Sequence, residues 1–317
     1  MNRFIYILGI LFIFASCSTD VVVDEPENVQ IVFSATVETK GTEVTTENLE
    51  RFYASAFVPE NGEQGIYLKS YFRDVEFEIG ADGNFYSNPP YYYPVSLPIV
   101  FLFYTPSGDE FGSEFCWDEF KWDWEKEEGY WENGCLMHNF SPNEEISLQC
   151  DLLMALGGDN NNAVSELTNV NFIHLLSQIE IYSKSESSEY RYEVAGVKLG
   201  GIASKANLTD SVEWDIIEGN SADYEDNLDT PIVLSSNYLS VMNPSSGNAF
   251  LLPQTLSEDA YIAVYLQVRD YSGNKVYPVG NDEYDWVSIK ISGDWESSEK
   301  YEYKLDFTTW FEDHQTN

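Results

Sequence analysis

Apolar and polar residues alternate in Val29-Gln30-Ile31-Val32-Phe33-Ser34-Ala35-Thr36-Val37-Glu38. Successive side chains of an extended chain point to opposite faces, so this alternation is typical of a β-strand with one buried face. The expected buried face consists of Val29, Ile31, Phe33, Ala35 and Val37.

The rest of the chain repeats this signal and offers no helical alternative. Alternating segments lie at residues 75–79, 287–291 and 301–307. Segments that are apolar on both faces lie at residues 95–104, 171–182 and 261–268. The second kind is expected of strands in the middle of a β-sandwich. Because no long segment keeps a helical apolar stripe, the sequence predicts an all-β fold.

The length predicts two domains. A single hydrophobic core usually stops growing near ~250 residues, and this chain has 317 residues. Turn-forming residues separate the predicted strands, and the longest such run, at residues 157–162, lies near the middle of the chain. We therefore expect two β-sandwich domains in tandem, at residues 29–165 and 166–317, the first carrying a Trp-rich insertion at residues 116–135.

The N-terminus resembles a bacterial lipoprotein export signal. Arg3 precedes an apolar run at residues 4–14, which is too short to span a bilayer and suits a secretory signal. The following Ala15-Ser16-Cys17 resembles a lipobox, in which Cys17 becomes the lipidated first residue. This predicts a signal peptide at residues 1–16 and a tether at residues 17–28. An ordinary signal peptide cut elsewhere is the alternative.

The charge of the chain excludes some partners. With 54 acidic and 16 basic residues, the net charge is -38, which makes extended contact with nucleic-acid phosphates repulsive. The same charge opposes adsorption to anionic lipid. We expect membrane contact through the lipid anchor only.

No motif predicts catalysis, a cofactor or a metal. His138, His174 and His314 stand in no metal-ligand spacing, and His174 is expected to be a core or edge histidine with one hydrogen bond. A pair of carboxylates for glycoside hydrolysis occurs by chance among 54 acids, so none is nominated. The acidic segments at residues 223–229 and 281–285 are interpreted as solvated turns rather than calcium sites.

Aromatic residues are concentrated between Cys116 and Cys135. The tryptophans there are Trp117, Trp122, Trp124 and Trp131. Two interpretations remain open: an exposed platform that stacks on sugar rings or on a partner, and a hairpin that buries its tryptophans against the sandwich. The alternation in Trp122-Asp123-Trp124 favours the hairpin.

The cysteines predict one disulfide. Cys116 and Cys135 flank the Trp-rich insertion, and an exported protein meets oxidising conditions, so we expect a bond between them. Cys150 is expected to be a buried thiol on a strand at residues 148–152.

Several short segments, in their order and spacing, resemble the fimbrillin family of surface lipoproteins and pilins. They are Ile31-Val32-Phe33-Ser34-Ala35, Thr39-Lys40-Gly41-Thr42, Asp151-Leu152-Leu153-Met154-Ala155, residues 170–181, Val197-Lys198-Leu199-Gly200-Gly201, Phe250-Leu251-Leu252-Pro253-Gln254, Gly293-Asp294-Trp295 and Tyr301-Glu302-Tyr303. The resemblance implies two sandwiches of transthyretin-like topology, export as an outer-membrane lipoprotein, and proteolytic removal of the tether with the first strand. A strand from another fimbrial subunit then fills the vacated groove.

Two features depart from the shaft subunits of that family. Their arginine-specific processing site is replaced here by Lys40, with Arg51 as the first arginine after the strand, and only ten residues follow Phe307. The resemblance therefore implies a non-enzymatic shaft, tip or anchor subunit, or a related adhesin, located on the outer membrane or, if processed, in the fimbria. The alternatives are a stand-alone lipoprotein that binds host or bacterial glycans or proteins through the tryptophans, and, less favoured, a carboxylate-pair hydrolase.

Overall fold

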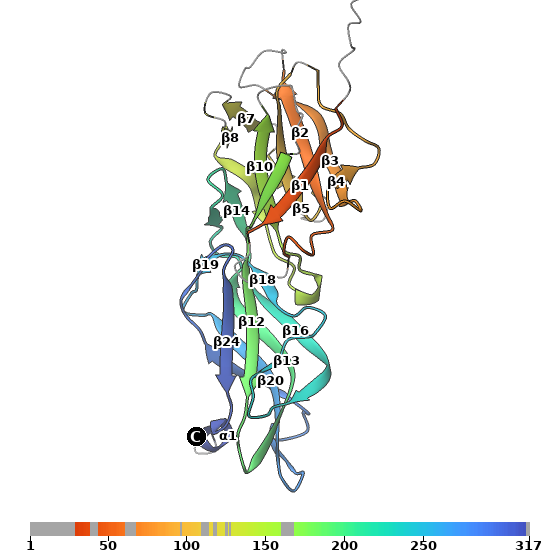
Figure 1. Cartoon of the computed structure of the whole chain (residues 1–317). Coiled ribbons are helices and arrows are strands. Elements are labelled where there is room, and N and C mark those ends of the chain that lie inside the picture. Colours follow the sequence, from red (N-terminus) through yellow and green to blue (C-terminus); the bar gives the residue numbers. More distant parts are fainter. Residues whose placement is uncertain are drawn as a thin grey trace, which may run out of the picture.

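The computed structural model describes residues 29–38, 44–60, 68–95, 97–108, 114–116, 119–123, 126, 128–159 and 168–314. β-Strands dominate, and they form two lobes that lie end to end (Figure 1). The described helices are the 3₁₀ helix η2 (Ile146–Leu148) and the helix α1 (Trp310–His314). Neither is long and apolar enough to cross a membrane. The prediction of an all-β fold is confirmed.

The first lobe contains a closed barrel. Its strands, in spatial order, are β1 (Val32–Val37), β11 (Thr168–His174), β10 (Leu153–Asp159), β5 (Ile99–Thr105), β2 (Arg51–Pro59), β3 (Leu68–Ile79) and β4 (Phe85–Ser87). The barrel closes because β4 pairs with β1. Strand β5 is buried from Ile99 to Tyr104, as expected from its apolar run.

An outer layer covers one side of this barrel. It comprises a sheet of β15 (Trp214–Ile216), β14 (Ala206–Thr209), β9 (Cys135–Phe140) and β6 (Glu114–Phe115), and a hairpin of β7 (Phe120–Asp123) and β8 (Glu128–Trp131). Side chains of this layer pack with outward-facing residues of β5, such as Val100 and Leu102, in a shared hydrophobic core. A second core, rich in phenylalanine, fills the barrel.

The second lobe is built from two facing sheets. One contains β16 (Ser221–Val233), β13 (Tyr190–Ala203), β20 (Tyr261–Asp270), β21 (Lys275–Tyr277) and β22 (Asp285–Lys290). The other contains β17 (Leu239–Ser240), β12 (Ser177–Lys184), β18 (Ala249–Leu251) and β24 (Lys300–Asp306), and a small ladder joins β19 (Gln254–Thr255) to β23 (Asp294–Trp295). Their apolar faces form one core, to which β12 contributes Ile179 and Ile181 and β13 contributes Val194 and Val197.

The strand ladders cross the predicted boundary at 165/166. Strand β11 pairs with β1 and β10, and β14 pairs with β9, so residues 168–174 and 206–216 lie with the first lobe. The expectation of a single strand at residues 171–182 is wrong. The segment is divided into β11 and β12, since Leu175 and Leu176 carry the chain from one lobe to the other. The division into domains at 165/166 stays a prediction.

Two further expectations are corrected. The segment at residues 223–229 is part of the long strand β16 rather than a turn, because it pairs with β13. Cys150 is exposed and lies outside any strand. The 3₁₀ helix η2 precedes it instead, and the neighbouring Gln149 amide nitrogen donates to the Asn143 carbonyl (2.8 Å) while its amide oxygen accepts from the Phe250 backbone N–H (2.8 Å).

A buried polar pair marks the point where the chain leaves the first lobe. His174 Nδ1 lies 2.7 Å from Asp151 Oδ2, and both side chains are buried. The prediction of a hydrogen-bonded core histidine is confirmed. The Ser298 hydroxyl of the second lobe donates to the His174 carbonyl (2.7 Å), which ties the two lobes together at this point.

Candidate functional site

Strand β1 holds the barrel closed through both of its edges. It runs parallel to β11, from Phe33 opposite Thr168 to Val37 opposite Phe172. On the other edge it runs antiparallel to β4, with Phe33 opposite Phe85. Just before the strand, the Ile31 N–H donates to the Tyr91 carbonyl (2.8 Å). Removing β1 would therefore leave unpaired ladder groups on two neighbouring strands at once.

The inward face of β1 is apolar, and Phe33 lies at its centre. The centroid of the Phe33 ring lies 4.9 to 6.1 Å from four other aromatic rings. These rings belong to Phe52, Phe77, Phe101 and Phe103. They surround Phe33 on the inner side of the barrel.

The predicted first strand is largely borne out by burial. Ile31, Phe33 and Val37 are buried, and Ala35 is partly buried against the same core. The expectation is wrong for Val29, which is 42% exposed. On the outer face the Ser34 hydroxyl donates to Asn169 Oδ1 (2.9 Å), so the polar positions also contact β11.

The two candidate processing residues differ in position. Lys40 lies outside the described residues. Arg51 begins β2, stands opposite Glu78 of β3 and forms an ion pair with Glu76 at 3.3 Å. Since proteases bind an extended, unpaired segment, Arg51 is a poor substrate while β2 stays paired with β3.

The interpretation of the four tryptophans as an exposed platform is contradicted for two of them. Trp122 and Trp131 are each 3% exposed and belong to the core beneath the outer layer. The hairpin of β7 and β8 buries them by placing Phe120 against Trp131, with ring centroids 4.6 Å apart. Trp117 and Trp124 lie outside the described residues.

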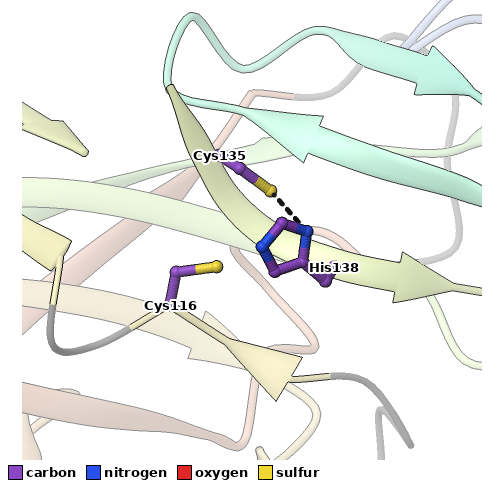
Figure 2. Close-up of side chains that lie close together, drawn as sticks. All are labelled: Cys116, Cys135 and His138. Carbon is purple, nitrogen blue, oxygen red and sulfur yellow. Dashed lines mark hydrogen bonds between the residues drawn. The ribbon is translucent and has the colours of Figure 1, made fainter. Parts of the chain in front are cut away.

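Cys116 and Cys135, the predicted disulfide partners, lie close together but do not form a disulfide in the structure. The two sulfurs and a ring nitrogen of His138 all lie within 4.8 Å of one another. Figure 2 shows both thiols directed toward the imidazole, with Cys135 Sγ 3.1 Å from His138 Nδ1. Burial raises the pKa of the Cys135 thiol. The proximity of His138 was not predicted from the sequence.

The family model of fimbrillin-like proteins matches residues 35–317. The chain belongs to the fimbrillin-like family. The match covers nearly the whole of both lobes and begins inside β1, so the resemblance found in the sequence is confirmed. Membership of this family supports a fimbrial or adhesin role at the cell surface and a non-enzymatic one.

Solved structures similar to this fimbrillin-like chain include proteins of Bacteroides and Parabacteroides species. A proposed cell adhesion protein of Bacteroides ovatus has a TM-score of 0.48 at 12% identity, covering 89% of this chain and 93% of that one. A second, from Bacteroides uniformis, has a TM-score of 0.45 at 13% identity, covering 90% and 95%. A fimbrial assembly protein of Parabacteroides distasonis has a TM-score of 0.35 at 11% identity, covering 88% and 92%. Identities this low say nothing about a ligand. None of the curated proteins matches the sequence.

Proposed function

We propose that this fimbrillin-like chain is a subunit of a surface fimbria and that it assembles by exchange of its first strand. The observation that carries the proposal is the place of β1, which seals the barrel between β4 and β11 and buries Phe33 among four aromatic rings. A strand from another subunit with the same alternation would regain both ladders and refill the groove. Backbone hydrogen bonds would supply affinity, and the apolar pockets would supply specificity.

The attachment of β1 is local, which suits a strand that leaves. The buried side chains of β1, Phe33 and Val37, and Ile31 just before it contribute about 1.5 to 3 kcal/mol each when fully buried. The other six strands of the barrel remain joined through β11, β10, β5, β2, β3 and β4. Loss of β1 would thus open the barrel without breaking any ladder among the remaining strands.

The proposed location follows from the export segment, which lies outside the described residues. Cys17 would carry the lipid and hold the chain on the outer membrane until the tether and β1 are removed together. Other fimbrial subunits would be the partners. The glycan-binding alternative is less favoured, because two of the four tryptophans that it requires at the surface, Trp122 and Trp131, are buried.

Limited proteolysis of the full chain tests strand exchange. Cleavage between Thr39 and Arg51 should leave a folded core that begins near residues 40–52 and forms oligomers or binds a labelled peptide of residues 29–38. A peptide carrying Phe33→Asp should not bind, because the aromatic pocket cannot pair the carboxylate. A peptide carrying Glu38→Gln should bind like the unaltered one, since Glu38 is exposed.

The size of a species in gel filtration and the fluorescence anisotropy of the peptide give the readout. A cleaved core that stays monomeric and ignores the peptide would contradict strand exchange and favour a stand-alone lipoprotein. Equal binding of the Phe33→Asp peptide would contradict the assigned groove.

Lipidation is tested separately by metabolic labelling with a fatty-acid analogue. The chain should carry the label, and Cys17→Ser should abolish it, because Cys17 alone follows an apolar run and small residues. Cys150→Ser serves as the control and should remain labelled. Label that persists on the Cys17→Ser protein would show that the acceptor is another residue.

A further inference from the structure

Three potential metal ligands converge in the outer layer of the first lobe. Cys116 directly follows β6, and Cys135 and His138 belong to the neighbouring strand β9. The Cys116 N–H donates to the Leu136 carbonyl (2.9 Å), which fixes the end of β6 against β9. The ladder therefore holds the two thiols and the imidazole in one place, as Figure 2 shows.

Irregular pairing explains how Cys135 and His138 face the same way. Residues three apart on a regular strand point to opposite faces. Between Phe140 and Cys135, however, the pairing of β9 with β14 shifts twice, and each shift adds one residue to β9. Such bulges turn side chains away from the regular alternation. They bring the Cys135 sulfur to 3.1 Å from His138 Nδ1.

The surroundings favour a cation. Cys135 is buried, and Cys116 and His138 are partly buried. The carboxylates of Glu119 and Asp210 both act electrostatically on Cys135. Glu119 Oε2 is itself buried and has no hydrogen-bond partner among the residues that the structure describes. A positive ion beside the sulfurs would offset this concentration of negative charge.

We propose that Cys116, Cys135 and His138 bind one zinc ion, with water completing a tetrahedral site. Zinc takes thiolate ligands at about 2.3 Å and imidazole ligands at about 2.0 to 2.1 Å, which places tetrahedral ligand atoms roughly 3.5 to 3.8 Å apart. The three ligand atoms already lie within 4.8 Å of one another. Calcium and magnesium prefer an all-oxygen set, so two thiols and an imidazole select a softer ion.

The zinc site and the disulfide expected from the sequence exclude each other. Both use the same two sulfurs, and a disulfide would consume the thiolates that bind the metal. A bound ion would tie β6 to β9 and so clamp the two ends of the Trp-rich insertion at residues 116–135. This proposal does not depend on strand exchange, because β1 contributes no ligand.

Metal titration of the reduced full chain carrying Cys17→Ser provides the test. Cobalt(II) should bind with one equivalent per chain and show the thiolate charge-transfer and visible bands of a tetrahedral thiolate site, and zinc should displace it. Carboxylate binding alone would give no thiolate band. Zinc should also protect two of the three remaining thiols from alkylation, as counted by intact mass.

Variants assign the ligands. Cys135→Ser or His138→Gln should weaken zinc binding about 100-fold or more, since losing even an outer-shell partner typically costs 10–100-fold. The matched control Cys150→Ser should bind zinc normally, because Cys150 is exposed and lies outside the cluster. If a variant fails to fold, the proposal is still decided by the cobalt spectrum and the thiol protection of the chain in which Cys116, Cys135 and His138 are unaltered.

Three results would overturn the proposal. The first is a cobalt complex without a thiolate band, and the second is zinc affinity that is unchanged in a folded Cys135→Ser protein. The third is a Cys116–Cys135 disulfide in chain isolated without reductant but with zinc present throughout.

Discussion

Phe33→Ala is expected to lower the free energy of unfolding by about 3 to 5 kcal/mol, the usual cost of truncating a buried phenylalanine. Phe33 has no exposed surface and contacts four aromatic rings from β2, β3 and β5. Alanine would leave a cavity in the centre of the barrel that these rings cannot fill, because each is already fixed in a strand. Urea denaturation of the full chain, followed by tryptophan fluorescence, measures the loss.

The matched control is Val29→Ala, from the same predicted alternation. Val29 is 42% exposed and precedes β1, so its truncation should change the free energy of unfolding by no more than about 0.5 kcal/mol. A loss below 1 kcal/mol for Phe33→Ala, or equal losses for the two variants, would show that β1 does not anchor the barrel. The Phe33→Ala chain should also release its first strand more readily on proteolysis.

The second large effect is expected for Asp151→Ala. Asp151 and His174 form a buried hydrogen-bonded pair at 2.7 Å, and leaving the imidazole without its partner in the interior should cost about 3 kcal/mol, the upper end for a buried polar group that loses its hydrogen bond. The imidazole would lose its carboxylate in a place that water does not reach. Because the backbone of His174 also accepts a hydrogen bond from Ser298, the loss should disturb the junction of the two lobes.

Asp151→Asn provides the control for this pair. The asparagine side chain keeps an oxygen that accepts a hydrogen bond from the His174 ring, so its loss should be the smaller one, roughly 1 to 2 kcal/mol. Urea denaturation again gives the measurement, and amide hydrogen exchange at residues 174–177 shows where the structure loosens. Equal losses for Asp151→Ala and Asp151→Asn would mean that the hydrogen bond contributes nothing.

The sequence predicted those features that depend on neighbouring residues. The alternation at residues 29–38 identified β1, and the apolar run at residues 95–104 identified the buried strand β5. Where the same logic was wrong, the chain changed partners inside an apolar run. Residues 171–182 look like one strand, yet β11 pairs within the first lobe and β12 within the second.

Some of the burial could also be predicted locally, and some could not. The alternation around Trp122 favoured a buried hairpin, and Trp122 and Trp131 are buried. The Cys150 prediction failed because its burial depended on a strand that does not form. There, the 3₁₀ helix η2 forms instead, and the Gln149 side chain donates to the Asn143 carbonyl and accepts from the Phe250 N–H.

The sequence by itself thus determined the strand class, the buried face of β1 and the fimbrillin-like family. Only the tertiary structure decided which strands flank β1. The Ser34 hydroxyl, for example, donates to Asn169 Oδ1, which is 135 residues further along the chain. It also decided that Cys116, Cys135 and His138 share one site. Side-chain periodicity is a local property of the backbone, whereas strand partners and bulges are set by how distant segments pack together.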